Sequence, residues 1–145
     1  WSSDVCSSDL EQFRPKQFSW LAIISDPSIR TIRDLRGCHV PMLESLYDQC
    51  VAVIRDEFGL VKQDIIAFAN YPPSVYRLHF HFCAPFFSSG AFYAFRMHSL
   101  DTIINNLKIC PDYYRLSTMY VPVYTGSDLY RVWSNHEGDS DEAEF

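Results

Sequence analysis

The sequence lacks several features that would assign it to a protein class at once. Its five cysteines contain no C-x-x-C pair, so no disulfide framework is indicated and reduced thiols, mostly buried, are expected. No apolar run approaches the roughly 20 residues that a membrane-spanning helix needs. No signal peptide and no internal repeat is visible either. These absences together predict a soluble intracellular protein without a membrane partner.

An excess of basic residues is also missing. The chain of 145 residues has 18 acidic and 12 basic side chains, for a formal net charge of −6, which argues against binding phosphates or nucleic acid. However, five acids lie in residues 137–145 and two in residues 1–10, with no base in either segment. The body between these segments is therefore near neutral, and the charge no longer excludes a phosphate ligand.

The two ends differ from the rest of the chain. Residues 1–10 resemble the translation of a common sequencing-library adapter along their whole length, so we expect an artefact and a fragment without its own N-terminus. Residues 135–145 are expected to form an acidic disordered tail. Residues 11–134 remain as one folded domain, and a content of 48% apolar and 16% aromatic residues suffices for its core.

The spacing of apolar residues predicts an alternation of strands and helices. Strands are expected over residues 18–24, 65–69, 75–84 and 119–124, and helices over 41–58, 97–107 and, more briefly, 128–133. The first helix has apolar residues three and four apart, Pro41 in its first turn and Gly59 after its end. This order, with a tight Pro-Ser turn between adjacent strands, predicts an α+β fold in which helices pack on an antiparallel sheet.

The segment around residues 76–82 is the most informative for chemistry. Side chains alternate between the two faces of a strand, so Arg77, His79 and His81 would share one face, about 7 Å apart. The alternate residues, from Tyr76 to Phe82, are apolar and are expected in the core. The pattern predicts a row of three basic side chains on a single strand face.

Three interpretations of this row are open. The row could bind phosphates, with arginine supplying a fixed charge and one imidazole attacking phosphorus. It could bind zinc together with Cys83, although no other histidine or cysteine pair has ligand spacing. It could also be an ordinary exposed polar face. The preceding loop 70–74 offers the Ser74 hydroxyl and backbone amides beside the row, which favours phosphate binding.

The same residues resemble a known family. Histidines that alternate with apolar residues are similar to the histidine-triad (HIT) motif. More narrowly, residues 70–82, with the sequence NYPPSVYRLHFHF, resemble the C-terminal domain of the scavenger mRNA-decapping enzyme family. The resemblance extends over about residues 20–133, with further support in segments 22–43 and 104–118.

This resemblance implies a HIT-like catalytic domain over residues 11–134, without the N-terminal domain that closes over the cap in the family. It implies hydrolysis of the 5′-5′ triphosphate bridge of residual mRNA caps (m7GpppN) during mRNA decay, with release of 7-methylguanosine monophosphate. The implied nucleophile is His79. The implied phosphate-binding residues are His81, Ser74, Arg77 and Asn70.

The resemblance also implies that neither a metal nor another cofactor is needed. The implied partners are a capped dinucleotide or a short capped RNA and, in the longer protein, a second copy of the chain. The implied location is the cytoplasm, with the nucleus as a second compartment.

The chain departs from the family pattern at three positions. Arg77 stands where the first histidine of the triad is expected, Asn70 where a histidine precedes the turn, and Val75 where a tyrosine follows it. These differences leave two alternatives open. One is a non-catalytic cap-binding or regulatory paralogue, and the other is a different HIT-type hydrolase of nucleotide phosphoanhydrides.

Overall fold

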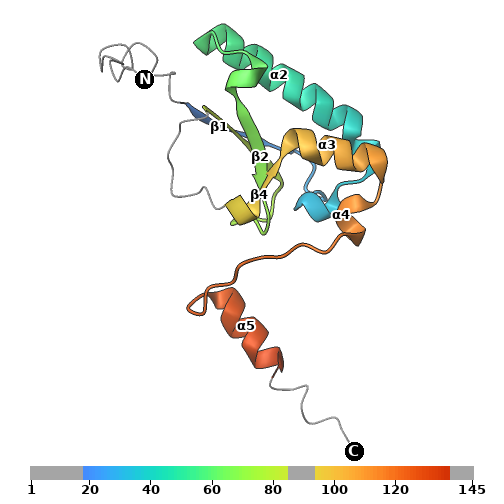
Figure 1. Cartoon of the computed structure of the whole chain (residues 1–145), viewed down its shortest axis with the longest axis vertical. Helices are drawn as coiled ribbons and strands as arrows, with labels where there is room; N and C mark the ends of the chain where they lie inside the picture. The colour runs from blue at the N-terminus through green and yellow to red at the C-terminus, as the bar shows by residue number, and fades with distance from the viewer. Residues whose placement is uncertain (1–17, 85–93, 138–145) are drawn as a thin grey trace, which may run out of the picture.

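Four strands form a single antiparallel sheet in the computed structural model, which describes residues 18–84 and 94–137 (Figure 1). The strands are β1 (Ser19–Ile23), β2 (Ile66–Asn70), β3 (His79–Cys83) and β4 (Met97–Ser99), in the spatial order β1-β3-β2-β4. The helices are α2 (Val40–Phe58), α3 (Leu100–Ile109), α4 (Tyr113–Leu116) and α5 (Asp128–Glu137). Short 3-10 turns cover Ile32–Asp34, Gly37–His39, Lys62–Asp64 and Ala94–Arg96. The predicted α+β class is confirmed.

Helix α2 follows the prediction closely. Its buried residues include Leu43, Tyr47 and Ile54, which recur at helical spacing on one side. The Tyr47 ring meets the Phe82 ring of β3 edge to face, with centroids 6.0 Å apart. Gly59 ends the helix at φ 72°, a left-handed conformation that glycine adopts without steric cost. The helix therefore covers the sheet face that carries Phe82.

Strand β3 separates a core face from a histidine face. Phe80 is 0% and Phe82 1% exposed, as the alternation predicts. The opposite face carries His79 and His81, and the cross-strand partners on β1 are Ile23 for His79 and Leu21 for His81. Because β3 is an inner strand, its histidines lie within the sheet rather than at its edge.

The predicted strand over residues 75–84 is too long, because β3 covers only His79–Cys83. Residues 74–77 form a bend, in which the Arg77 amide donates to the Val75 carbonyl at 2.9 Å. The bend leaves Tyr76 57% exposed rather than in the core. The predicted row of three basic groups on one strand face is therefore wrong, since Arg77 lies before the strand.

The predicted strand over residues 119–124 is also wrong, because residues 118–124 belong to no helix or strand. Met97–Ser99 forms the fourth strand instead and pairs with β2. Pro122 has no amide hydrogen with which to join a ladder, which disfavours pairing there.

The second helix starts later than predicted. The Ser99 hydroxyl accepts a hydrogen bond from the Thr102 amide at 3.2 Å, which caps α3 at Leu100 rather than at Met97. Further along, α5 ends at Glu137, so its last turn enters the segment predicted as tail. Within residues 18–84 and 94–137, no helix has both the length and the apolar character that crossing a membrane requires.

Candidate active site

Two histidines meet on the sheet face opposite α2. The His79 and His81 rings are both partly buried, and their centroids lie 5.3 Å apart with the planes at 65°. Their separation by one residue on β3 places both side chains on the same face, as the alternation predicts. The pair therefore forms a compact imidazole cluster in the middle of the sheet.

The orientation of the His79 ring is fixed by a backbone contact. Its Nδ1 lies 2.7 Å from the carbonyl oxygen of Arg77. A carbonyl oxygen can only accept a hydrogen bond, so Nδ1 carries the proton. In the neutral ring the lone pair then resides on Nε2. This tautomer is the one in which Nε2 can act as a nucleophile.

His81 lies in a more enclosed position. Its ring stacks on Phe68 of β2 at a centroid distance of 4.8 Å and an angle of 12°. The Asn70 Nδ2 atom lies 3.5 Å from His81 Nε2. Burial, with a smaller contribution from the neighbouring charge of His79, lowers the pKa of His81. His81 is thus held neutral at pH 7 beside His79.

Asn70 is brought to this cluster from the end of β2. Its amide nitrogen points to His81, whereas its Oδ1 is buried and has no hydrogen-bond partner among the described residues. A buried unpaired carbonyl oxygen carries a free-energy cost. The structure thus brings Asn70 next to His81, while its role in phosphate binding stays a prediction.

The structure places Arg77 and Ser74 together in the bend before β3. The Arg77 guanidinium donates to the carbonyl oxygens of Ile24 at 3.2 Å and Ser25 at 2.9 Å. Ser74 is exposed. The arginine thereby ties the bend to the end of β1, and the phosphate-binding roles of both residues remain predictions.

Arg96 is a neighbour of this region that the sequence analysis does not identify. Its guanidinium donates to the Pro72 carbonyl, and its own carbonyl accepts from the Tyr71 amide at 2.8 Å. Its Nε is buried without a partner among the described residues. Arg96 thus holds the loop that leads to Ser74. It occurs singly in an aromatic stretch, so no spacing pattern singles it out.

The described residues offer no set of ligands for a metal. Nowhere in 18–84 and 94–137 do three histidine, cysteine, aspartate or glutamate side chains come close enough to hold an ion. Cys83 is 2% exposed, and its Sγ lies 3.7 Å from the Ile66 carbonyl oxygen. Burial also raises the pKa of the Cys83 thiol. Cys83 is therefore a buried core thiol.

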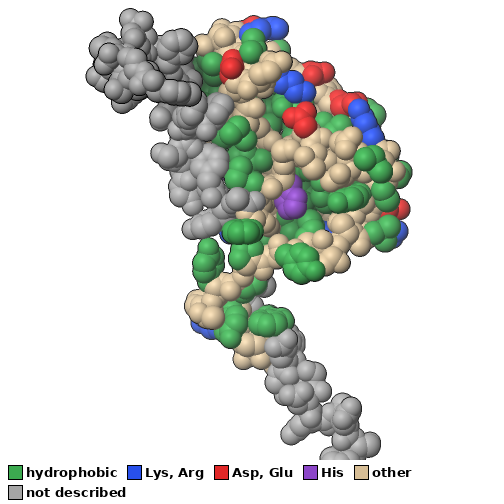
Figure 2. Space-filling model, viewed as in Figure 1, with side chains coloured by type: hydrophobic (Ala, Val, Ile, Leu, Met, Phe, Trp, Pro, Cys, Tyr) green, Lys and Arg blue, Asp and Glu red, His purple; other side chains and the backbone are tan. Residues whose placement is uncertain are grey.

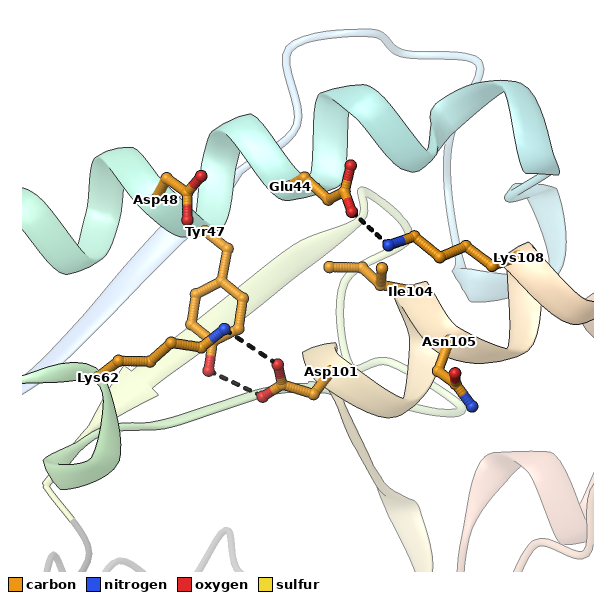
Figure 3. Close-up of a pocket in the computed structure, with 8 residues that line it drawn as sticks. All are labelled: Glu44, Tyr47, Asp48, Lys62, Asp101, Ile104, Asn105 and Lys108. Atoms are coloured by element: carbon orange, nitrogen blue, oxygen red, sulfur yellow. Dashed lines mark hydrogen bonds and ion pairs between the residues drawn. The ribbon is translucent and has the colours of Figure 1, made fainter.

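A separate cavity of about 400 Å³ lies between α2, the 3-10 turn at Lys62–Asp64 and α3 (Figure 3). Lys62 Nζ lies 3.3 Å from Asp101 Oδ1, and the Tyr47 hydroxyl donates to Asp101 at 2.9 Å. On the other side of the cavity, Lys108 pairs with Glu44. The charged side chains that line this cavity mostly pair with one another, and these pairs connect the three elements. None of the predicted site residues lines the cavity.

Charged side chains of both signs are mixed on the visible surface (Figure 2). Acidic and basic side chains are interspersed over the helical side of the molecule, and histidine surface is visible among apolar side chains (Figure 2). No broad field of one sign covers the visible face outside the grey residues. The visible face therefore offers, among the described residues, no basic patch on which a polyanion could be recognised by charge alone.

The two partly buried histidines His81 and His98 predict a stability that falls in mild acid. Burial lowers the pKa of His81 and of His98, the latter with a smaller contribution from Arg33. Below about pH 6.5 the unfolded chain binds protons that the folded chain does not, so the free energy of unfolding decreases as the pH falls. We expect a lower Tm at pH 5.5 than at pH 7.5, measured by circular dichroism. His98→Gln should reduce this difference, and a Tm equal or higher at pH 5.5 would contradict the assignment.

Comparison with known proteins shows which family the sequence resembles. Residues 5–94 match the sequence model of the family described as "Scavenger mRNA decapping enzyme C-term binding". A protein of Ascaris suum named m7GpppX diphosphatase is 36% identical over 110 residues, which cover 76% of this chain and 36% of that protein. Proteins with the same name from Caenorhabditis elegans and Homo sapiens are each 31% identical, over 78% and 68% of this chain.

The chain spans about a third of the length of these relatives, with aligned shares of 36%, 36% and 29%. The family match nevertheless covers well over half of the chain and includes the loop 70–74, β3 and both histidines. The chain therefore belongs to the scavenger mRNA-decapping enzyme family, in the part that corresponds to its C-terminal domain.

Proposed function

We propose that this domain hydrolyses the 5′-5′ triphosphate bridge of mRNA cap fragments, with His79 as the nucleophile. The observation that carries the proposal is the 2.7 Å contact between His79 Nδ1 and the Arg77 carbonyl. It holds the ring in the tautomer whose Nε2 has a free lone pair. The names of the relatives, m7GpppX diphosphatase, support the choice of substrate.

The proposed reaction has two displacements at phosphorus. His79 Nε2 attacks the phosphate attached to 7-methylguanosine, and the bond between that phosphorus and the bridging oxygen breaks, so that a nucleoside diphosphate leaves. Water then attacks the same phosphorus and the N–P bond breaks. The products are 7-methylguanosine monophosphate and free His79, and the proton from water goes to solvent.

The surroundings of His79 suit these two displacement steps. A neutral imidazole becomes positively charged when Nε2 bonds to phosphorus, and the Arg77 carbonyl oxygen at Nδ1–H stabilises that charge. His81 is kept neutral and stands 5.3 Å from His79 between ring centroids, so it does not add a like charge to the intermediate. In this proposal His81 donates to a phosphate oxygen rather than transferring a proton.

The direct test incubates the chain with m7GpppG and follows the products by anion-exchange chromatography. We expect 7-methylguanosine monophosphate and GDP in equal amounts. The same rate is expected with and without EDTA, because the proposed steps use only protein groups. Intact m7GpppG after prolonged incubation, with the chain shown to be folded, would contradict the proposal.

A second candidate function is binding of the cap without turnover. It is favoured by one observation: the Arg77 guanidinium is already engaged by the carbonyls of Ile24 and Ser25, which leaves fewer donors for phosphate. This candidate predicts that m7GpppG binds the chain and remains uncleaved while His79 is intact. Isothermal titration together with the product assay separates the two candidates.

A further inference from the structure

A cavity of about 250 Å³ adjoins the loop that carries Ser74. One side is formed by Pro72, Pro73 and Tyr76, which flank Ser74 in the chain, and the other by residues 122–124 and Ser127. Hydrophobic side chains gather where this extended segment leads to α5 (Figure 2). The volume is below the roughly 300–1,000 Å³ of pockets for drug-sized ligands, so it suits a single ring system.

Two aromatic rings line this cavity. Tyr76 is 57% and Tyr124 58% exposed, although both are large aromatic side chains. The Arg30 guanidinium lies over the Tyr76 ring, 5.6 Å from its centroid. Exposed aromatic rings beside an arginine are the elements with which proteins stack nucleobases without reading their sequence.

The cavity also contains a basic group with unused hydrogen-bonding capacity. Arg96 lines it, and its Nε is buried without a partner among the described residues. A buried unpaired donor costs free energy until an acceptor arrives. Carbonyl and ring-nitrogen atoms of a base are such acceptors. The guanidinium of Arg96 makes the cavity locally positive, which disfavours a cationic ring.

We propose that this cavity binds an uncharged nucleobase, stacked by Tyr76 and Tyr124, with its phosphates directed toward Ser74. Resting on the function proposed above, the occupant is the nucleoside on the leaving side of the cap bridge. The 7-methylguanine base is positively charged and would lie beside Arg96, so it is disfavoured at this position. The cavity would therefore determine the orientation in which the cap binds, with the leaving nucleoside in the cavity.

The test measures binding of three probes to the full 145-residue chain by isothermal titration: GMP, 7-methyl-GMP and ribose 5-phosphate. We expect GMP to bind about tenfold more tightly than ribose 5-phosphate, since a base stack contributes roughly that factor. GMP should also bind more tightly than 7-methyl-GMP, because the methylated base is positively charged and would lie beside Arg96. Tyr124→Ala and Tyr76→Ala should each weaken GMP binding by about tenfold. Tyr124→Phe keeps the ring and should bind GMP like the parent chain.

Tyr120→Ala is the matched control, because Tyr120 lies in the same extended segment, is 89% exposed and does not line the cavity. It should leave GMP binding unchanged. The proposal is overturned if GMP binds no better than ribose 5-phosphate, if 7-methyl-GMP binds better than GMP, or if both tyrosine-to-alanine variants bind GMP normally. Since these probes contain no cap bridge, a failure of the cleavage assay would leave this result intact.

Discussion

Replacing His79 by asparagine is expected to reduce the rate of m7GpppG cleavage by at least about a thousandfold. Asparagine keeps a polar side chain of similar size but has no nitrogen lone pair that can attack phosphorus. The loss should appear in kcat rather than in KM, because His79 acts on the reacting phosphorus. Rates are measured from product formation with substrate in excess.

The matched control for this variant is His98→Asn. His98 pairs with Ala69 across β2 and β4, whereas His81 pairs with Phe68, so His98 belongs to the opposite sheet face. Its replacement should change the cleavage rate by no more than a few-fold at a temperature well below Tm. Equal losses in His79→Asn and His98→Asn would indicate a general loss of structure rather than a missing nucleophile.

The largest expected effect on stability is that of Phe80→Ala. Phe80 is 0% exposed and lies between the two histidines of β3, with its ring in the core. Truncating a buried phenylalanine removes apolar burial and leaves a cavity, with a typical cost of about 3–5 kcal/mol. That is a large part of the free energy of unfolding of a small domain. Urea unfolding followed by circular dichroism measures the difference.

Two further variants make this prediction specific. Phe80→Leu retains most of the apolar volume and should cost clearly less than Phe80→Ala. Phe95→Ala removes the same ring from a position that is 79% exposed, and should change the free energy of unfolding by no more than about 0.5 kcal/mol. Similar losses in Phe80→Ala and Phe95→Ala would contradict the placement of β3 in the core.

The parts of the fold that are evident in the sequence are those set by local periodicity. The spacing of Leu43, Tyr47 and Ile54 with Gly59 at the end predicts α2, because a helix face and its stop are local properties. The alternation within β3 likewise predicts which residues are buried and that His79 and His81 share a face. Family membership rests on these same residues and is confirmed by the comparisons.

Other features depend on contacts that are distant in sequence. The bend before β3 is stabilised where Arg77 meets the carbonyls of Ile24 and Ser25 and the Leu78 amide meets the Ile29 carbonyl. An alternation of residue types carries no information about those partners, so the strand is predicted to begin too early. Strand β4 has only three residues, too few for a period to be recognised. The contact between Arg96, which precedes β4, and the Pro72 carbonyl also joins residues that are distant in sequence, so no local pattern predicts it.

The most direct measurement of the central claim is identification of the covalent intermediate. The chain is mixed with m7GpppG, quenched at alkaline pH within the first turnover, digested and analysed by mass spectrometry. The proposed mechanism predicts a 7-methylguanosine monophosphate group on the peptide that contains His79, absent in His79→Asn. Cleavage of the cap by the parent chain with this group on another residue, or with no covalent species at any time point, would contradict it.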